Sequence, residues 1–123
     1  MTVLDMRGSA FQLLGDDFSG DTVIGTGIDE DVLRIAGIQR ADAFIAVSDN
    51  DNRNIMAGQV ARHIFGIKDV VMRIYDPVRE DTYRRMGYAT VCPTTTVSTL
   101  ILNQILPRPA TDDVVDTPTP VQE

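Results

Sequence analysis

The sequence lacks several features that would assign a class of protein at once. It has one cysteine, Cys92, which rules out an internal disulfide and fits a reducing cytoplasm. No apolar run approaches the roughly 18 residues needed to span a bilayer, and no charged and apolar leader opens the chain. Lysine and arginine (11) are outnumbered by aspartate and glutamate (18), so nucleic acid is not an expected partner. These absences favour an acidic cytoplasmic domain.

Motifs of catalysis and of metal binding are also missing. The acidic groups lack the spacing of a calcium loop, and no serine or cysteine stands in a nucleophile-elbow pattern. No paired acid and base indicates catalysis. The chain also has no G-x-G-x-x-G segment, the loop that holds a pyrophosphate on a helix N-terminus. The sequence therefore predicts neither an enzyme nor a metal protein.

Short apolar runs alternate with helical patterns along the chain. Strands are predicted at residues 2–5, 22–24, 43–47, 70–75 and 89–92. Helices are predicted at residues 9–14, 29–36, 51–65, 77–87 and 94–106. Strands that alternate with helices form parallel sheets, so we expect an α/β fold with a doubly wound parallel sheet of five strands. The run at 43–47 is apolar throughout, which predicts a strand covered on both faces.

The end of the chain differs in composition from the rest. Residues 107–123 are rich in proline and acids, so we expect a folded domain at residues 1–106 and a disordered Pro-rich acidic tail after it. The last predicted helix has large apolar residues on more than one face. Either part of this helix is buried against another chain, or it covers the edge of the sheet. These residues are Val97, Leu100, Ile101, Leu102, Ile105 and Leu106.

Ligands of doubly wound sheets bind beyond the carboxyl ends of the strands, and the first two strands end in distinctive residues. Asp5 could accept hydrogen bonds from a ribose, and Arg7 could meet a phosphate or stack on an adenine. The alternative is that Asp5 caps the short helix and Arg7 is solvated. Gly25, Thr26 and Gly27 would let the backbone approach a flat ring closely, or they form a plain turn.

Two further strand ends carry polar residues. Ser48 and Asp49 follow a buried strand, and Asn54 lies in the first turn of the next helix, which together would form a polar shelf. The alternative for this segment is ordinary helix capping. Arg73 lies inside an apolar strand, where a charge needs a partner. It forms either a structural ion pair, with Asp76 for example, or a latch between strand ends and a bound ligand.

Four segments together resemble RCK domains of the TrkA N-terminal type, which regulate potassium conductance and uptake. The family patterns D-x-x-x-L-x-x-A-G-I and A-D-x-x-I-A-V-T-D-x-D-x-x-N are matched by DEDVLRIAGI at 29–38 and ADAFIAVSDNDNRNI at 41–55. The R-x-x-D-P motif and the final strand are matched by RIYDP at 73–77 and MGYATVCPT at 86–94. The order and spacing agree over residues 3–106.

The resemblance implies a Rossmann-like domain that binds NAD(H) or ATP, ADP or AMP without catalysis. It also implies a homodimer or larger ring at the cytoplasmic side of a membrane potassium channel or transporter. On this view Asp5, Arg7, residues 25–27, the Ser48 loop with Asn54, and Arg73 would line the nucleotide site. Two alternatives stay open: a scaffold that has lost its ligand, and the cofactor half of an NAD-dependent oxidoreductase.

Two departures from the family pattern bear on this expectation. The family begins one β-α unit earlier, with the glycine fingerprint, so Met1 falls where the second strand should start. Gly25-Thr26 also stands where the family usually has Gly-Asp. In the strand order 3-2-1-4-5-6 the lost strand is central and its absence leaves two apolar edges. An incomplete start, a strand from another polypeptide, or direct closure into a five-stranded sheet would each account for this.

Overall fold

The computed structural model describes residues 1–107, so the tail expected at 107–123 lies outside the described residues apart from Pro107. The strands are β1 (Thr2–Asp5), β2 (Asp21–Ile24), β3 (Ala43–Ala46), β4 (Asp69–Arg73) and β5 (Ala89–Val91). The α-helices are α1 (Glu30–Ile35), α2 (Asp51–Gln59), α3 (Pro77–Arg85) and α4 (Pro93–Ile105). The shorter helical segments are η1 (Gly8–Leu14), η2 (Ile38–Arg40) and η3 (Val60–Ile64). The predicted alternation of strands and helices is confirmed.

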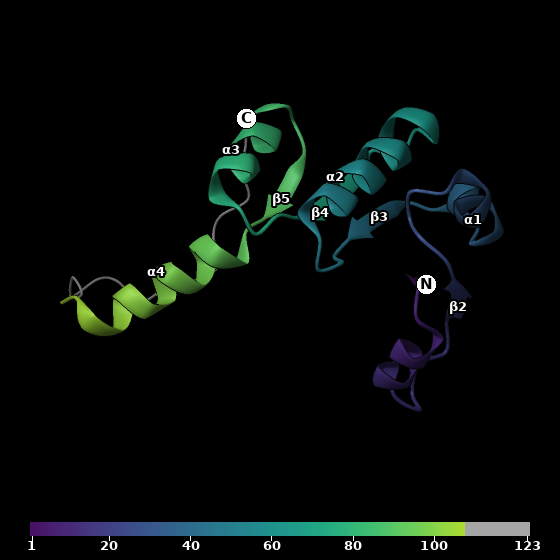
Figure 1. Ribbon diagram of the computed structural model, residues 1–123, viewed down its shortest axis with the longest axis horizontal. Helices are drawn as coiled ribbons and strands as arrows, with labels where there is room; N and C mark the ends of the chain where they lie inside the picture. Colours follow the sequence, from purple (N-terminus) through teal and green to yellow (C-terminus); the bar gives the residue numbers. More distant parts are fainter. Residues whose placement is uncertain (108–123) are drawn as a thin grey trace.

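All pairing between strands is parallel, as expected, but the five strands form two sheets (Figure 1). One sheet has the order β1-β2 and the other the order β3-β4-β5. Within the described residues β1 and β3 are not hydrogen-bonded to each other. Direct closure into one five-stranded sheet, one of the three possibilities above, is therefore not what the chain adopts.

Helix boundaries follow the capping signals of the sequence at two places. Asp29 caps α1, where its Oδ1 accepts hydrogen bonds from the amides of Asp31 (2.9 Å) and Val32 (3.3 Å). Asp76 caps α3 by accepting from the Val78 amide at 3.0 Å, and Pro77 takes the first helical position. Local side-chain chemistry thus determines where these helices begin.

The helix predicted at 51–65 is interrupted near its end. The α-helical part stops at Gln59, and Val60–Ile64 continues as a π-helix. A π-helix has a wider turn than an α-helix, with hydrogen bonds to the carbonyl five residues earlier. Here the Phe65 amide donates to the Val60 carbonyl at 3.4 Å. The apolar stripe of the sequence continues across this change, so periodicity alone does not reveal it.

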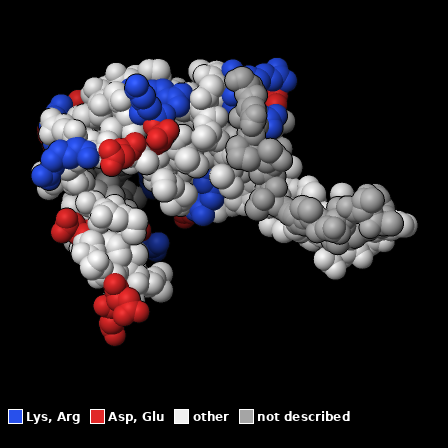
Figure 2. Space-filling model, turned by 180° about the vertical axis from the view of Figure 1, so that it is seen from behind, with Lys and Arg blue, Asp and Glu red and all other residues white. Residues whose placement is uncertain are grey.

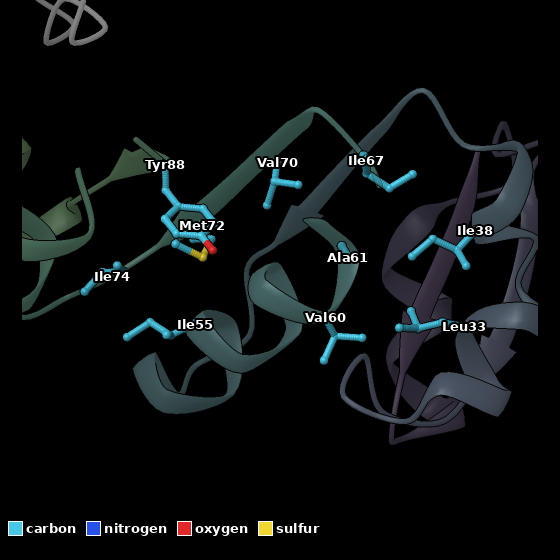
Figure 3. Packing of buried hydrophobic residues seen from close by; sticks show 10 residues of the cluster. All are labelled: Leu33, Ile38, Ile55, Val60, Ala61, Ile67, Val70, Met72, Ile74 and Tyr88. Carbon is cyan, nitrogen blue, oxygen red and sulfur yellow. The ribbon is translucent and has the colours of Figure 1, made fainter. Parts of the chain in front are cut away.

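The hydrophobic core lies between the three-stranded sheet and the helical segments on one of its faces (Figure 3). The α2 helix packs across β3 and β4. Leu33 of α1 and Ile38 of η2 join the same cluster, and Leu4 of β1 packs against it, so the two-stranded sheet is attached through side chains rather than a ladder. The buried members of the cluster are Leu33, Ile38, Ile55, Val60, Ala61, Ile67, Val70, Met72, Ile74 and Tyr88.

The opposite face of the three-stranded sheet corrects the expectation that residues 43–47 are covered on both sides. Phe44 and Ala46 face the core, but Ile45 is 63% exposed and Val47 is 52% exposed. Side chains alternate between the two faces of a strand, and no helix among residues 1–107 covers the second face of β3. The continuous apolar run therefore reflects one covered face and one bare face.

The end of the described chain is also exposed. The α4 helix projects away from both sheets, and none of its residues is buried (Figure 1). No helix within residues 1–107 is long and apolar enough to cross a bilayer. Of the two expectations for this helix, covering its own sheet is not observed.

Close packing of α2 on β4 requires a glycine at position 58. A Cβ there would lie 2.7 Å from Met72 Cγ and 3.3 Å from a Val70 methyl group, and it would also collide with Met72 Sδ. Met72 is fully buried and has little room to move. The helix can approach the strand this closely only because residue 58 has no side chain.

We therefore expect Gly58→Ala to lower the free energy of unfolding by about 1–3 kcal/mol, despite the better helix propensity of alanine, because one extra methyl overpacks the core. Chemical denaturation would measure the change. Met56→Ala is a matched control on the same helix, since the Met56 side chain is half exposed. Stabilisation by Gly58→Ala would show that α2 does not pack on Met72 in this way.

Candidate functional site

The carboxyl ends of β3 and β4 are joined by the side chain of Asn54, which is 1% exposed. Its Oδ1 accepts hydrogen bonds from the Ser48 amide (2.8 Å) and the Ser48 hydroxyl (2.6 Å). Its Nδ2 donates to the carbonyls of Ser48 (2.9 Å) and Arg73 (2.8 Å). An amide side chain offers two donor hydrogens and two acceptor lone pairs, so Asn54 has none left for a ligand. It is a positioning residue.

Arg73 lies beside the same junction. Its Nη2 donates to the carbonyls of Val47 and Ser48, the latter at 3.0 Å, and its guanidinium lies 5.1 Å from the ring centroid of Tyr75. Among residues 1–107 no carboxylate pairs with Arg73, so the structural ion pair considered above is not found. Its Nε is buried without a hydrogen-bond partner in the same part of the chain. Arg73 therefore latches the end of β4 to the loop after β3.

A further acid holds the loop between β4 and α3. The carboxylate of Asp51 accepts from the amides of Tyr75 (2.8 Å) and Asp76 (3.1 Å). The actual cap of α2 is Asn50, whose Oδ1 accepts from the Arg53 amide at 2.9 Å. Sequence reasoning treated residues 49–52 as one capping segment and missed the role of Asp51, because its partners lie more than twenty residues further along the chain.

The carboxyl ends of β1 and β2 are also joined. The Gly25 amide donates to the Asp5 carbonyl at 3.0 Å. Asp5 Oδ1 accepts from the Arg7 amide at 2.8 Å in a turn just before η1. This is not the capping role considered above, because Arg7 is the N-cap residue of η1 and no side chain caps that helix. Asp5 Oδ2 makes no hydrogen bond within the described residues, and neither does the exposed guanidinium of Arg7. One carboxylate oxygen and one cation thus stay available at this end of the sheet.

The loop after β2 brings the two sheets together. A Cβ at Gly27 would lie 3.4 Å from Ala57 Cβ of α2 and 3.6 Å from Phe44 of β3. A Cβ at Gly25 would lie 2.6 Å from the Val32 side chain. A glycine is therefore required at position 25, where the loop meets α1, whereas a Cβ at position 27 would make only ordinary contacts with α2 and β3. The Thr26 hydroxyl accepts from the Ile28 amide at 3.4 Å, as in a plain turn.

Asp49 is exposed, and its carboxylate has no hydrogen-bond partner within the described residues. No group of three or more His, Cys, Asp or Glu side chains in that part of the chain is placed to hold a metal ion. The strand-end residues thus form two groups, with Asp5 and Arg7 at the β1-β2 sheet and Ser48, Asn54 and Arg73, which are engaged with one another, at the β3-β4-β5 sheet. Within the described residues, Asp5 Oδ2 and the side chains of Arg7 and Asp49 are open.

Comparison with known proteins is decisive at this point. The family model of the TrkA-N domain matches residues 1–94. The chain belongs to the TrkA-N domain family. Among curated relatives, the "Trk system potassium uptake protein TrkA" of Streptomyces coelicolor is 44% identical over 110 residues, covering 89% of this chain and 49% of the relative. The TrkA homolog of Archaeoglobus fulgidus is 36% identical over 74 residues, covering 56% of this chain and 17% of that protein.

This TrkA-N domain therefore spans about half the length of the Streptomyces relative. Two solved structures share its fold. The NAD(P)-binding domain of an exopolyphosphatase-related protein from Archaeoglobus fulgidus has a TM-score of 0.64 at 19% identity, covering 85% of this chain and 77% of that one. The Kef CTD of Shewanella denitrificans in its AMP-bound form has a TM-score of 0.57 at 17% identity, covering 83% and 65%. At these identities the likeness shows a Rossmann-like fold alone.

If the amide of Asn54 holds the TrkA-N strand ends together, Asn54→Ala should lower the free energy of unfolding by roughly 2–3 kcal/mol. The substitution would leave buried polar groups of Ser48 and Arg73 without hydrogen-bond partners. Asn54→Asp should also destabilise, since it places a carboxylate oxygen against two carbonyls. Denaturant titration would measure both.

Asn52→Ala is the matched control two residues away. The Asn52 side chain is exposed and accepts only from Arg79, at 2.7 Å, so its loss should change stability by less than about 0.5 kcal/mol. Equal effects at positions 52 and 54 would contradict the central role of Asn54.

Proposed function

We propose that this TrkA-N domain is a cytoplasmic regulatory module of a membrane potassium channel or transporter, and that it senses an adenine nucleotide or NAD(H). The regulatory role is supported by the family and by relatives named as potassium uptake proteins. The observation that carries the ligand proposal is the open carboxylate oxygen of Asp5, which lies at the same end of the sheet as the turn that contains Gly25 and Gly27. A ribose hydroxyl and a flat base are complementary to these two features.

The available groups fit an adenosine better than a long polyphosphate. Asp5 Oδ2 is an acceptor for a ribose hydroxyl, and residues 25–27 offer backbone to a base. Arg7 is an exposed cation within two residues of Asp5 and would meet the first phosphate or stack on the adenine. Ser48 and Arg73 would shape the far side of the site, with Asn54 as the positioning residue behind them. Asp49 would approach a ribose rather than a phosphate because of its charge.

The division into two sheets suggests how a ligand would act. The β1-β2 sheet carries Asp5, and the β3-β4-β5 sheet carries Ser48 and Arg73, and no ladder joins the two sheets within the described residues. A nucleotide that contacts both sheets would favour one relative arrangement over others. Such a bias, passed through a homodimer or larger ring of these modules, would act on the membrane protein.

A scaffold without a ligand is the second candidate. It is favoured by Thr26, which stands where the family pattern usually has an acid and whose hydroxyl accepts from its own turn. In that case the domain would act through its surface alone, and nucleotide would have no effect on it.

Asp5→Asn should weaken binding of the preferred nucleotide about tenfold or more, because it keeps the Oδ1 contact with the Arg7 amide but replaces the open acceptor by an amide donor. Calorimetry with AMP, ADP, ATP, NAD and NADH would measure this. Asp21→Asn, at the exposed amino end of β2, is the charge-matched control and should bind normally. No heat and no thermal shift with any of the five ligands would favour the scaffold.

Deletion of the gene in its own organism should slow rubidium or potassium uptake at low external potassium. The unchanged gene should restore the rate, whereas Asp5→Asn should restore it only in part if sensing is needed. Uptake that is unaffected by deletion would argue against a role in potassium transport, whatever the calorimetry finds.

A further inference from the structure

Two neighbouring side chains at the end of the long helical segment hold the start of β5. Arg62 and His63 both belong to the π-helical segment η3, and both contact Tyr88, the residue just before β5. An extra residue in a helical turn rotates the side chains that follow by about 100° around the axis. The π-helix therefore sets which side chains at the end of this helix reach β5.

Arg62 provides the first half of this contact. Its guanidinium lies 4.2 Å from the centroid of the Tyr88 ring, and it donates to the carbonyls of Gly87 (3.3 Å) and Lys68 (3.5 Å). Within residues 1–107 no carboxylate forms an ion pair with it. The positive charge of Arg62 is thus balanced in this part of the chain by carbonyl dipoles and by the face of a ring.

His63 provides the second half. Its Nε2 lies 2.7 Å from the Tyr88 hydroxyl oxygen, and the two rings meet edge to face with their centroids 6.3 Å apart. Tyr88 is 4% exposed, so its hydroxyl hydrogen needs an acceptor, and His63 is the one found among the described residues. Tyr88 therefore donates to neutral His63, whose own hydrogen is on Nδ1.

A proton added to His63 would break this arrangement, because an imidazolium has no lone pair left to accept from Tyr88. A second positive charge would also lie beside Arg62 at the same ring. The other ionisable group at this ring is Tyr83 of α3, which packs on Tyr88 at 6.3 Å, and within residues 1–107 no carboxylate pairs with His63. In Figure 2 basic side chains lie over the body of the molecule, whereas an acidic group at the tip of the lower arm stands apart from them.

The strand next to this contact has little other support. β5 has three residues and is paired with β4 alone among the described residues. Its far end leads through Cys92 directly into α4. A change at Tyr88 would therefore be felt along the whole strand and at the start of α4.

We propose that His63 and Tyr88 form a proton-sensitive clamp, in which neutral His63 holds the start of β5 against η3 and protonated His63 releases it. The stabilisation is present at about pH 8 and is lost as the pH falls through the range in which histidine takes up a proton. His63 is the only histidine of the chain. The clamp lies at the amino ends of the strands, opposite the candidate nucleotide site, so it does not depend on the proposed ligand.

The thiol of Cys92 reports on the clamp, because it is the only cysteine, is 6% exposed and directly follows β5. Its rate of reaction with 4,4′-dithiodipyridine would be compared with that of His63→Gln at the same pH, which cancels the ionisation of the thiol itself. The glutamine oxygen can still accept from Tyr88 but takes up no proton in this range. The two rates should agree at about pH 8, and at about pH 5.5 the unchanged chain should react roughly threefold faster or more.

Two further variants separate the clamp from a general effect of acid. Tyr88→Phe keeps the ring under Arg62 but removes the hydroxyl, so it should react faster than the unchanged chain already at about pH 8. Lys68→Gln is the matched control, since its exposed side chain is removed from the contact and only its carbonyl takes part. It should respond to pH as the unchanged chain does. A rate ratio to His63→Gln that stays the same at both pH values, or that falls in acid, would overturn the proposal.

Nuclear magnetic resonance on the unchanged chain tests the clamp without any variant that has to fold. The ring protons of the single histidine and the backbone amides of residues 87–91 would be followed through the same pH range. The amide signals should change with the same midpoint as the His63 ring. Amide signals of β5 that stay constant while the imidazole takes up its proton would refute the clamp.

Discussion

The buried side-chain amide of Asn54 fixes how the carboxyl ends of β3 and β4 lie relative to each other, and the neighbouring loops depend on this junction. Asn54 is almost fully inaccessible, and a buried amide costs several kilocalories per mole unless its donors and acceptors are paired. Its four hydrogen bonds are made at once only when the ends of β3 and β4 lie at one separation and one register. Since these bonds are shielded from water, each supports the others. The position of the Ser48 loop follows from this arrangement.

The strand-end loops are not all held equally firmly to this junction. The loop before α3 is held by hydrogen bonds, because the Asp51 carboxylate accepts from two of its backbone amides. Arg73 also donates a hydrogen bond back to the loop after β3. The position of the β1-β2 sheet depends instead on the packing of Leu4 and on the contact of Gly27 with α2. Packing without a ladder resists sliding less than hydrogen-bonded strands do. The boundary between the two sheets is therefore the place where a bound molecule would have the greatest effect.

The three-stranded sheet shows two environments within single strands. The side that faces α2 is packed so closely that a glycine is required at position 58, while Ile45 and Val91 on the other side stay exposed. Exposed apolar surface of this kind favours association with another surface. The α4 helix has no charged residue and also exposes apolar side chains. The candidate site and the exposed apolar side chains thus lie on different parts of one sheet, its carboxyl edge and its bare face.

The sequence by itself determined the alternation of strands and helices, the parallel pairing, and the caps at Asp29 and Asp76, because these depend on neighbouring residues and on periodicity. It also indicated the family, since four short motifs occur in the right order. Only the tertiary structure decided that the strands divide into two sheets, that Asp51 holds the loop after β4, and that Arg73 binds carbonyls instead of a carboxylate. Those outcomes depend on residues such as Asn54 and Arg73, 19 positions apart, meeting across neighbouring strands. The tertiary structure also decided that one face of β3 is bare. An apolar run such as residues 43–47 fits a strand covered on one face or on both, and only the placement of the helices distinguishes the two.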